Sequence, residues 1–219
     1  ISSSQVFVRT WNPTTLAWNS ATRIDSNGLS AGSLAVTINA LGNTMTTWRQ
    51  SDGVQNRSWA NRYSVDAGLW GDAGVVETFD GGQVYDPKVV LDSMNHGTVV
   101  WRQLHGGSWF IWANRFDWVT GWWGDAGIID VGAANVEPNI GVDGNGNVFA
   151  IYGRAGVATA IAANRFSVST GAWGDAGLIE PVPGGSSSAP RIAGAPPGYA
   201  VTVWTAQEGP DRVDTNFFQ

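Results

Sequence analysis

A unit of about 52 residues recurs along this chain of 219 residues and constrains its fold more than any other feature. Its marker motif ends in Ala-Asn-Arg-Tyr or Ala-Asn-Arg-Phe and is clearest in the copies that begin at Ser58, Ile111 and Ile161. Copies start at positions 6, 58, 111, 161 and 213, so successive spacings are 52, 53, 50 and 52 residues. A period in this range predicts an array of similar modules. Positions shared by all copies then serve the fold, and function is to be sought where the copies differ.

Composition narrows the class of protein. Thirteen Trp and 29 Gly favour β-structure with many tight turns, and the net charge of −6 argues against binding to nucleic acid. The chain has no cysteine, which excludes disulfides and Cys-based metal sites, and we predict no cofactor and no metal site. No apolar run reaches the roughly 18 residues that a spanning helix needs, so we predict no membrane insertion. The chain starts at Ile1 without methionine or a signal peptide, and we interpret it as a processed or excised segment.

Each unit contains four short β-type runs. Taken from residue 139 onward, one set of these runs is 139–143, 148–152, 161–166 and 177–180. An Asn-Gly turn at 145–146 joins the first two, as in a hairpin. A four-stranded antiparallel meander repeated at this length predicts an all-β fold, a β-propeller of four four-stranded blades. We expect one domain over residues 1–219, with units at 6–57, 58–110, 111–160 and 161–212 and a partial unit at 213–219.

The two ends of the chain predict how the ring closes. The strand with the marker motif occurs five times and the other three strands four times each. We expect a blade split between the termini, in which residues 190–205 join residues 21–25 and one terminal copy of the marker strand. The other terminal copy is then spare, or it pairs with a second molecule and makes a homo-oligomer. Ring closure removes the exposed edge strands through which open sheets aggregate.

One connection resembles a known motif. The segment Ser64-Val-Asp-Ala-Gly-Leu-Trp70 is similar, with one residue fewer, to the Asp-box of sialidase-like propellers, which lies between the third and fourth strands of a blade. The whole chain also resembles repeat arrays of secreted bacterial proteins that carry Trp-Ala-Asn-Arg-Tyr. These resemblances imply a propeller fold and a secreted or cell-surface location. The Asp-box is structural in its family, so the resemblance implies no activity.

Loop lengths differ between copies on one side only. The last residue of the first strand and the terminal aromatic of the second are nine positions apart in every unit, and the span of the third and fourth strands is likewise constant. The loop from the second to the third strand and the loop between units do change in length. In a meander these two loops emerge on the same side of the molecule, which we name the variable face. Variation confined to one face is typical of a binding surface.

The variable face carries aromatic, Arg, amide and carboxylate groups, a mixture that suits a neutral polar ligand such as a sugar. The second unit is the richest in them. The candidate ligand-binding residues are Arg49, Gln50, Tyr85, Asp86, Arg102, Gln103, His105, Trp109 and Arg154.

Residues that recur in register are interpreted as structural. We expect packing between blades from the Trp at 18, 70, 123 and 173 and from the aromatics at 48, 101, 152 and 204, and a repeated structural hydrogen bond from the Asn at 61, 114 and 164. Many of the eleven Arg are expected to stack between repeats. The Asp143–Asn147 loop spaces oxygen atoms as a calcium site does, but a hairpin explains it equally, and the question stays open.

These observations favour a binding protein that is not an enzyme. Only four Glu are present, two of them at the repeated end of the fourth strand, and the two His stand near no nucleophile motif. Our first hypothesis is lectin-like recognition of carbohydrates or surface glycoconjugates through the variable face. The alternative is a scaffold for protein interaction or adhesion on a bacterial surface. A sialidase-like glycoside hydrolase is the third hypothesis and the least favoured, because a glycosidase needs two facing carboxylates.

Overall fold

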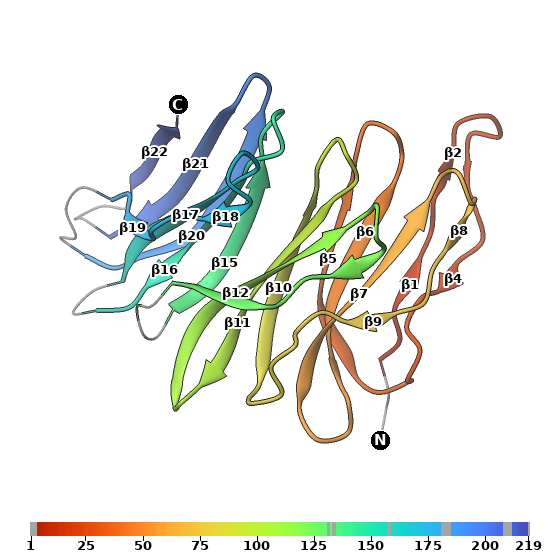
Figure 1. Cartoon of the computed structure of the whole chain (residues 1–219), viewed down its shortest axis with the longest axis horizontal. Helices are drawn as coiled ribbons and strands as arrows, with labels where there is room; N and C mark the ends of the chain where they lie inside the picture. Colours follow the sequence, from red (N-terminus) through yellow and green to blue (C-terminus); the bar gives the residue numbers. More distant parts are fainter. Residues whose placement is uncertain are drawn as a thin grey trace.

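A computed structural model describes residues 4–130, 132, 135–156, 159–180, 185–207 and 212–218. Every regular element in these residues is a β-strand, and all strand pairs are antiparallel, as predicted (Figure 1). The same residues contain no helix of the length and apolarity needed to cross a membrane.

Three sheets of five strands follow one pattern. In each, three long strands form a meander, and two short segments both pair with the third strand of the meander. The first sheet comprises β5 (Ala31–Ile38), β6 (Thr44–Ser51), β7 (Asn56–Ser64), β8 (Leu69–Trp70) and β9 (Gly74–Val75). The second comprises β10 (Val84–Leu91), β11 (Gly97–His105), β12 (Ser108–Asp117), β13 (Trp122–Trp123) and β14 (Gly127–Asp130). The third comprises β15 (Asn135–Val142), β16 (Val148–Arg154), β17 (Ala160–Ser167), β18 (Ala172–Trp173) and β19 (Gly177–Leu178).

Smaller sheets flank these three. The last sheet consists of β20 (Ser187–Ala195), β21 (Tyr199–Ala206) and β22 (Arg212–Phe218). The N-terminal segment, residues 4–25, contains the pairs β1 (Phe7–Val8) with β4 (Thr22–Arg23) and β2 (Trp11–Asn12) with β3 (Ala17–Trp18). The strands predicted at 139–143, 148–152 and 161–166 therefore overlap β15, β16 and β17. The predicted fourth strand is shorter than expected, because the chain first turns back as β18 and then continues as β19.

Successive sheets pack face to face through their first strands. β10 lies against β5 and β6, β15 against β10 and β11, and β20 against β15 and β16. Alternate residues of a strand point to opposite faces, so each sheet offers one face to the sheet before it and the other to the sheet after it. Between the second and third sheets, Val90 and Val100 pack with Ile140, Ala150 and Tyr152. Burial of these apolar surfaces is the main stabilising term.

The aromatic at the end of each second strand anchors this packing. Trp48, Trp101 and Tyr152 are 0% exposed and Trp204 is 3% exposed, which confirms their predicted structural role. The Trp at the end of the short segment after the third strand also packs between units, as predicted, since Trp70, Trp123 and Trp173 lie against the clusters that join two units. Its ring also meets the aromatic at the cross-strand position of its own sheet, because the two residues form a register pair on adjacent strands. These pairs are Trp11 with Trp18, Tyr63 with Trp70, Phe116 with Trp123 and Phe166 with Trp173.

The repeated Asn forms the predicted structural hydrogen bond. The Nδ2 atoms of Asn61, Asn114 and Asn164 donate to a backbone oxygen near the fourth strand of the preceding unit, at 3.1, 2.8 and 2.7 Å. The Arg that follows the Asn also bridges units, because its guanidinium stacks on an aromatic ring of the next sheet. Arg62 lies 4.5 Å from the ring centre of Phe116, and Arg115 lies 4.9 Å from that of Phe166. The expectation of Arg stacking between repeats is confirmed at these positions.

A buried carboxylate binds the backbone at the start of the marker strand in three places. Asp25, Glu77 and Glu180 accept hydrogen bonds from the backbone N–H groups of Val6, Ser58 and Ile161, respectively. Each carboxylate finds a different second partner. Arg23 binds Asp25, Arg57 binds Glu77, Arg154 binds Asp130, and the Ser187 hydroxyl donates to Glu180. Buried charges are tolerated when they are paired in this way.

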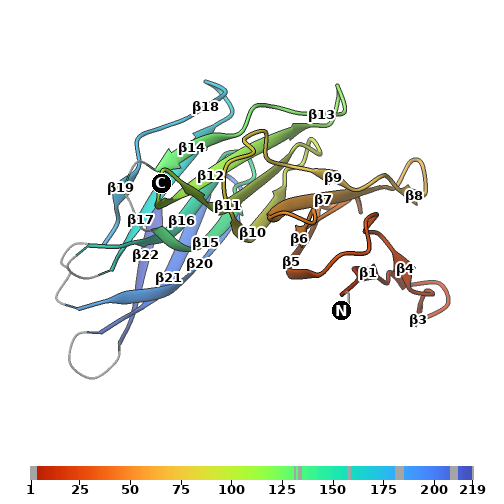
Figure 2. The same cartoon turned by 90° about the horizontal axis from the view of Figure 1, so that it is seen from below.

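The predicted closure of the ring by a split blade is not formed among the described residues. β22, the C-terminal copy of the marker strand, pairs with β21, as one of the two alternatives allowed. Residues 21–25, which were expected to join this blade as its fourth strand, instead pair as β4 with β1 of their own segment. Figures 1 and 2 place the N-terminal segment and the last sheet at opposite ends of the row of sheets.

Replacement of Asn114 by Ala tests the tie between units. Asn114 is 3% exposed and donates to the oxygens of buried Val76 and of Gly124, so its loss leaves the buried Val76 oxygen without this donor. We expect the free energy of unfolding to fall by about 1–3 kcal/mol, measured by urea denaturation. Asp66→Ala, which removes an exposed polar side chain, should change it by less than about 0.5 kcal/mol. Equal stability of Asn114→Ala and the wild type would contradict the assignment.

Acid unfolding tests the buried carboxylate of Asp25. Hydrogen bonds from Arg23, and then from the Val6 N–H and Gln50, hold the pKa of Asp25 far below its ordinary value. Since the folded pKa is the lower one, ionised Asp25 stabilises the fold above about pH 4, and this contribution is lost as the pH falls further. Burial raises the pKa of Glu77, so Glu77 changes the pH dependence of stability in the opposite direction to Asp25. A comparison of variants isolates the contribution of Asp25. The urea midpoint of Asp25→Asn should depend less on pH between about 5 and 2 than that of Asp66→Asn.

Candidate functional site

A β-bulge recurs at the start of every first strand and directs one side chain per unit. The register shifts between Gly32 and Ala35 in the first sheet and at the equivalent place in the next three. The bulged residue has φ near +50° although it is not glycine, a conformation that bulges stabilise. These residues are Ser33, Asp86, Glu137 and Ala189, with φ of 52°, 52°, 49° and 53°. The backbone is shared by all copies, so the difference lies in the side chain, and only the second and third units place a carboxylate there.

A pocket of about 450 Å³ lies beside three of these bulges and is the candidate functional site. It is bounded by the first strands of the second, third and last sheets, β10, β15 and β20, together with one residue of β11. We name it the bulge pocket. Its lining residues are Asp86, Lys88, Arg102, Glu137, Pro138, Ala189 and Arg191.

Cations exceed carboxylates in the bulge pocket. Asp86 forms an ion pair with Arg102, with 2.9 Å between Oδ2 and Nε. Glu137 accepts a hydrogen bond from the backbone N–H of Ala189 at 2.9 Å, which ties the third sheet to the last one. Lys88 and Arg191 form no ion pair with a carboxylate of the described residues. The three cations and two carboxylates give the pocket a net positive charge, and neither Lys88 nor Arg191 is held in a salt bridge within the part of the chain that the structure describes.

Arg102 links the pocket to an aromatic cluster. Its guanidinium carbon lies 5.2 Å from the ring centres of both Tyr85 and Trp109, and these rings meet edge to face at 5.4 Å. Arg49 of the first sheet lies 5.0 Å from the Tyr85 ring centre. The Nε–H of Arg102 is buried, is not directed at the Asp86 oxygen and has no hydrogen-bond acceptor among the described residues. Five predicted residues, Arg49, Tyr85, Asp86, Arg102 and Trp109, thus come together.

Two of the other predicted residues are structural. Gln50 and Gln103 are 0% exposed. Their Oε1 atoms accept a hydrogen bond at 2.8 Å from the indole N–H of Trp48 and Trp101, and their amide nitrogens donate to backbone oxygens of the preceding connection. A side chain that is fully buried and bonded at both ends contacts no ligand. Their assignment to a binding site was wrong, and alternation along β6 and β11 explains why, since each lies two positions after a buried Trp.

Arg154 and His105 lie apart from the cluster. Arg154 holds Asp130 with two nitrogens, at 2.6 and 3.0 Å, and takes the place that Gln50 and Gln103 occupy in the earlier sheets. His105 is exposed at the end of β11 and packs edge to face on Phe79, with ring centres 4.9 Å apart. The structure thus separates both residues from Tyr85 and Trp109.

Sequence reasoning left Lys88 and Arg191 out of the candidate set and gave Glu137 too little weight. A signal for them was available. The bulged residue precedes a proline in three units, at 87, 138 and 190, and the residue after that proline is Lys88, Asn139 or Arg191. Register pairing of Lys88 with Val100 and of Arg191 with Val203 shows that the two cations occupy equivalent positions in the second and the last sheet.

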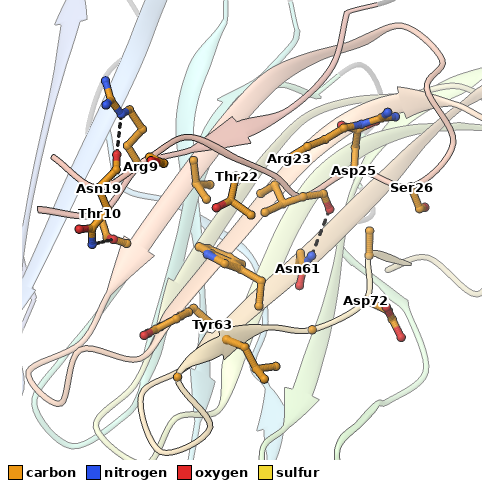
Figure 3. A pocket seen from close by; sticks show the side chains of 18 residues that line it. Arg9, Thr10, Asn19, Thr22, Arg23, Asp25, Ser26, Asn61, Tyr63 and Asp72 are labelled. Atoms are coloured by element: carbon orange, nitrogen blue, oxygen red, sulfur yellow. Dashed lines mark hydrogen bonds and ion pairs between the residues drawn. The ribbon is translucent and has the colours of Figure 1, made fainter.

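A larger pocket of about 610 Å³ lies between the N-terminal segment and the first sheet (Figure 3). Its polar groups mostly bind one another. Arg23 pairs with Asp25, Asn61 donates to the Ile24 oxygen, and Arg9 donates to the Asn19 oxygen. These contacts belong to the structural pattern of the repeat, and we therefore rank this pocket below the bulge pocket as a ligand site.

The loop considered for calcium is internally bonded. Oδ1 of Asp143 accepts from the backbone N–H groups of Asn145 and Asn147, and Oδ2 accepts from the Asn147 amide. Asp92 accepts from its own hairpin in the same way. This arrangement favours the hairpin interpretation. No group of three or more His, Cys, Asp or Glu side chains among the described residues is placed to hold a metal ion.

Comparison with known proteins shows a likeness of fold. No protein-family model and no curated protein matches the sequence. An ulvan lyase of polysaccharide lyase family PL25 superposes with a TM-score of 0.63 at 8% identity, over 90% of this chain and 55% of the lyase. The NanB sialidase of Streptococcus pneumoniae gives 0.56 at 8% identity, over 88% of this chain and 31% of the sialidase.

A third solved structure extends the likeness. The intramolecular trans-sialidase of Ruminococcus gnavus gives a TM-score of 0.54 at 9% identity, over 93% of this chain and 48% of that protein. The chain thus spans about half the length of the lyase and of the trans-sialidase, and a third of the NanB sialidase. These structures are propeller folds, and the chain resembles them at the level of fold.

Proposed function

We propose that this chain binds glycans that carry an acidic group, with the bulge pocket as the site and without catalysing a reaction. The observation that carries the proposal is the pair of cations, Lys88 and Arg191, that line the pocket without a carboxylate partner among the described residues. An ammonium and a guanidinium that line one pocket, one from the second sheet and one from the last, suit a carboxylate or sulfate group of a sugar. This replaces the neutral sugar expected from the sequence, because that expectation did not include either cation.

The aromatic cluster supports a carbohydrate rather than a free anion. The rings of Tyr85 and Trp109 contact the guanidinium of Arg102, and Arg102 also lines the pocket. Aromatic rings pack against the C–H faces of sugars, while fixed polar groups hold the hydroxyls. Among the proteins of similar fold, the ulvan lyase was solved with -[GlcA(1-4)Rha3S]- bound, and GlcA is a uronic acid. In our proposal the chain meets such ligands outside the cell, as a secreted or surface protein.

The state of the two carboxylates favours binding over hydrolysis. A glycosidase needs one carboxyl to act as acid and one as base or nucleophile on opposite sides of the bond. In the bulge pocket Asp86 is engaged by Arg102 and Glu137 by the Ala189 N–H. Both carboxylates therefore have a structural role in joining strands or sheets.

A glycoside hydrolase is the second candidate, because Asp86 and Glu137 line the same pocket. It predicts turnover of fluorogenic glycosides that is lost in Glu137→Gln while binding persists. Turnover that depends on Glu137 would replace our proposal of a non-catalytic protein. Binding without turnover, unchanged in Glu137→Gln, agrees with it.

A glycan array followed by calorimetry tests the proposal. We expect hits among uronate- or sulfate-bearing glycans and affinities that weaken as salt rises, because partly exposed charges are screened. A hydrogen bond to a charged group contributes about 1.5–3 kcal/mol, so Lys88→Ala and Arg191→Ala should each weaken binding by roughly 10- to 100-fold. Arg9→Ala removes the same charge at the far end of the molecule and should bind like the wild type. Hits restricted to neutral glycans, or full affinity in both pocket variants, would overturn the proposal.

A further inference from the structure

The first sheet leaves uncovered a face that the later sheets bury. Val36 and Ile38 on β5 are each 68% exposed, whereas the equivalent Val89 and Leu91 on β10 are 6% and 4% exposed. These positions are equivalent because Val36 pairs with Thr46 and Val89 pairs with Val99, and both partners lie two positions before the buried Trp of the second strand. Val89 and Leu91 are buried because the first sheet packs on them, with Met45 at the contact. The open face of β5 is therefore one half of an interface that this chain forms repeatedly.

The N-terminal segment covers only part of that face. Its Val6 and Ile24 pack on Trp48, which is fully buried. It also repeats the bonds of a third and fourth strand, since Asp25 accepts from the Val6 N–H and Asn61 of the next sheet donates to the Ile24 oxygen. Residues 4–25 therefore stand where the third and fourth strands of a preceding unit belong.

The place of the first and second strands of that unit is an apolar groove. The groove measures about 580 Å³ and runs between β1 and the β5–β6 hairpin. In the described residues β1 pairs with β4 alone, whereas β7, β12 and β17 each also pair with the second strand of their own sheet. The groove thus has the lining and the strand edge that a β-hairpin of this repeat requires. Its apolar lining includes Phe7, Trp11, Trp18, Leu34, Val36 and Ile38.

The last sheet has the complementary open face. Ala193 and Tyr199 are exposed, and Val201 and Val203 are half-buried, on the side of β20 and β21 opposite the buried Trp204. In the second sheet the same side, with Val90 and Val100, packs into the third sheet. In the described residues, the first sheet and the last sheet therefore carry the two complementary halves of one interface, at opposite ends of the row of sheets (Figures 1 and 2).

We propose that two copies of this chain associate head to tail, with the β20–β21 hairpin of one copy seated in the groove beside β5 of the other. The occupant is identified by the interface itself, which already joins the first sheet to the second, the second to the third and the third to the last. A heterologous contact of this kind closes into a ring or continues as a chain of copies. Strands β22 and β1 are both copies of the marker strand and compete for the edge of β21, so docking exchanges one for the other.

Single aspartates on each half of the interface test the proposal by sedimentation. The wild type should associate reversibly as its concentration rises. Val36→Asp and Ala193→Asp should each raise the dissociation constant on the order of a hundredfold, because an unpaired carboxylate becomes buried in the contact. Both residues are exposed in the single copy, so the urea midpoint should hardly change. Val54→Asp, at a residue 91% exposed in the loop between β6 and β7, is the matched control and should associate like the wild type.

Mixing the two variants identifies the geometry. Val36→Asp keeps an intact last sheet and Ala193→Asp an intact first sheet, so a head-to-tail contact forms once between them and stops at a heterodimer. A monomeric wild type at all concentrations, unimpaired association of either variant, or no heterodimer in the mixture would each overturn the proposal. Glycan binding is followed separately with Lys88→Ala, since Lys88 lies in the second sheet, whereas Arg191 pairs with Val203 on the open face of the last sheet and is left out of this comparison.

Discussion

The contact between one sheet and the next is the constraint on which the rest of this structure depends. A single sheet of this repeat cannot bury both of its faces, and each therefore needs a neighbour with the opposite set of alternating residues. Apolar burial around Trp101 and Tyr152 supplies most of the stabilisation, while the Asn61, Asn114 and Asn164 bonds set the register between units. Because this contact is identical in kind along the chain, the loops on the variable face are free to differ.

Much of the fold could be predicted from the sequence, because its determinants are local or repeated. Alternation and turn residues located the long strands, and the period located the units. The structural role of the repeated Asn followed from its recurrence alone. The split blade is not formed among the described residues because residues 21–25 pair with β1 of their own segment and not with the last sheet. Period and alternation do not distinguish a partner strand nearby from an equivalent one at the other end of the chain.

The candidate site was less predictable, because side-chain burial at the ends of strands depends on register. Gln50 and Arg49 are neighbours in sequence, yet one is fully buried beneath a Trp and the other stacks on Tyr85. Lys88 and Arg191 are more than a hundred residues apart in sequence, yet both line one pocket, from equivalent positions beside the bulge in the second and the last sheet. Loop composition identified the aromatic cluster, since its residues lie close together in one unit.

The Asn hydrogen bond has a direction, and that direction bears on how the molecule comes apart. Each Asn reaches backward, from the third strand of one unit to the connection that leaves the unit before it, so every interior module is held from both sides and a terminal one from a single side. In a linear array with nearest-neighbour coupling, stability is then graded along the chain. Fraying should start at the extremities and move inward, and slow amide exchange should concentrate in the second and third sheets, each of which packs between two neighbouring sheets.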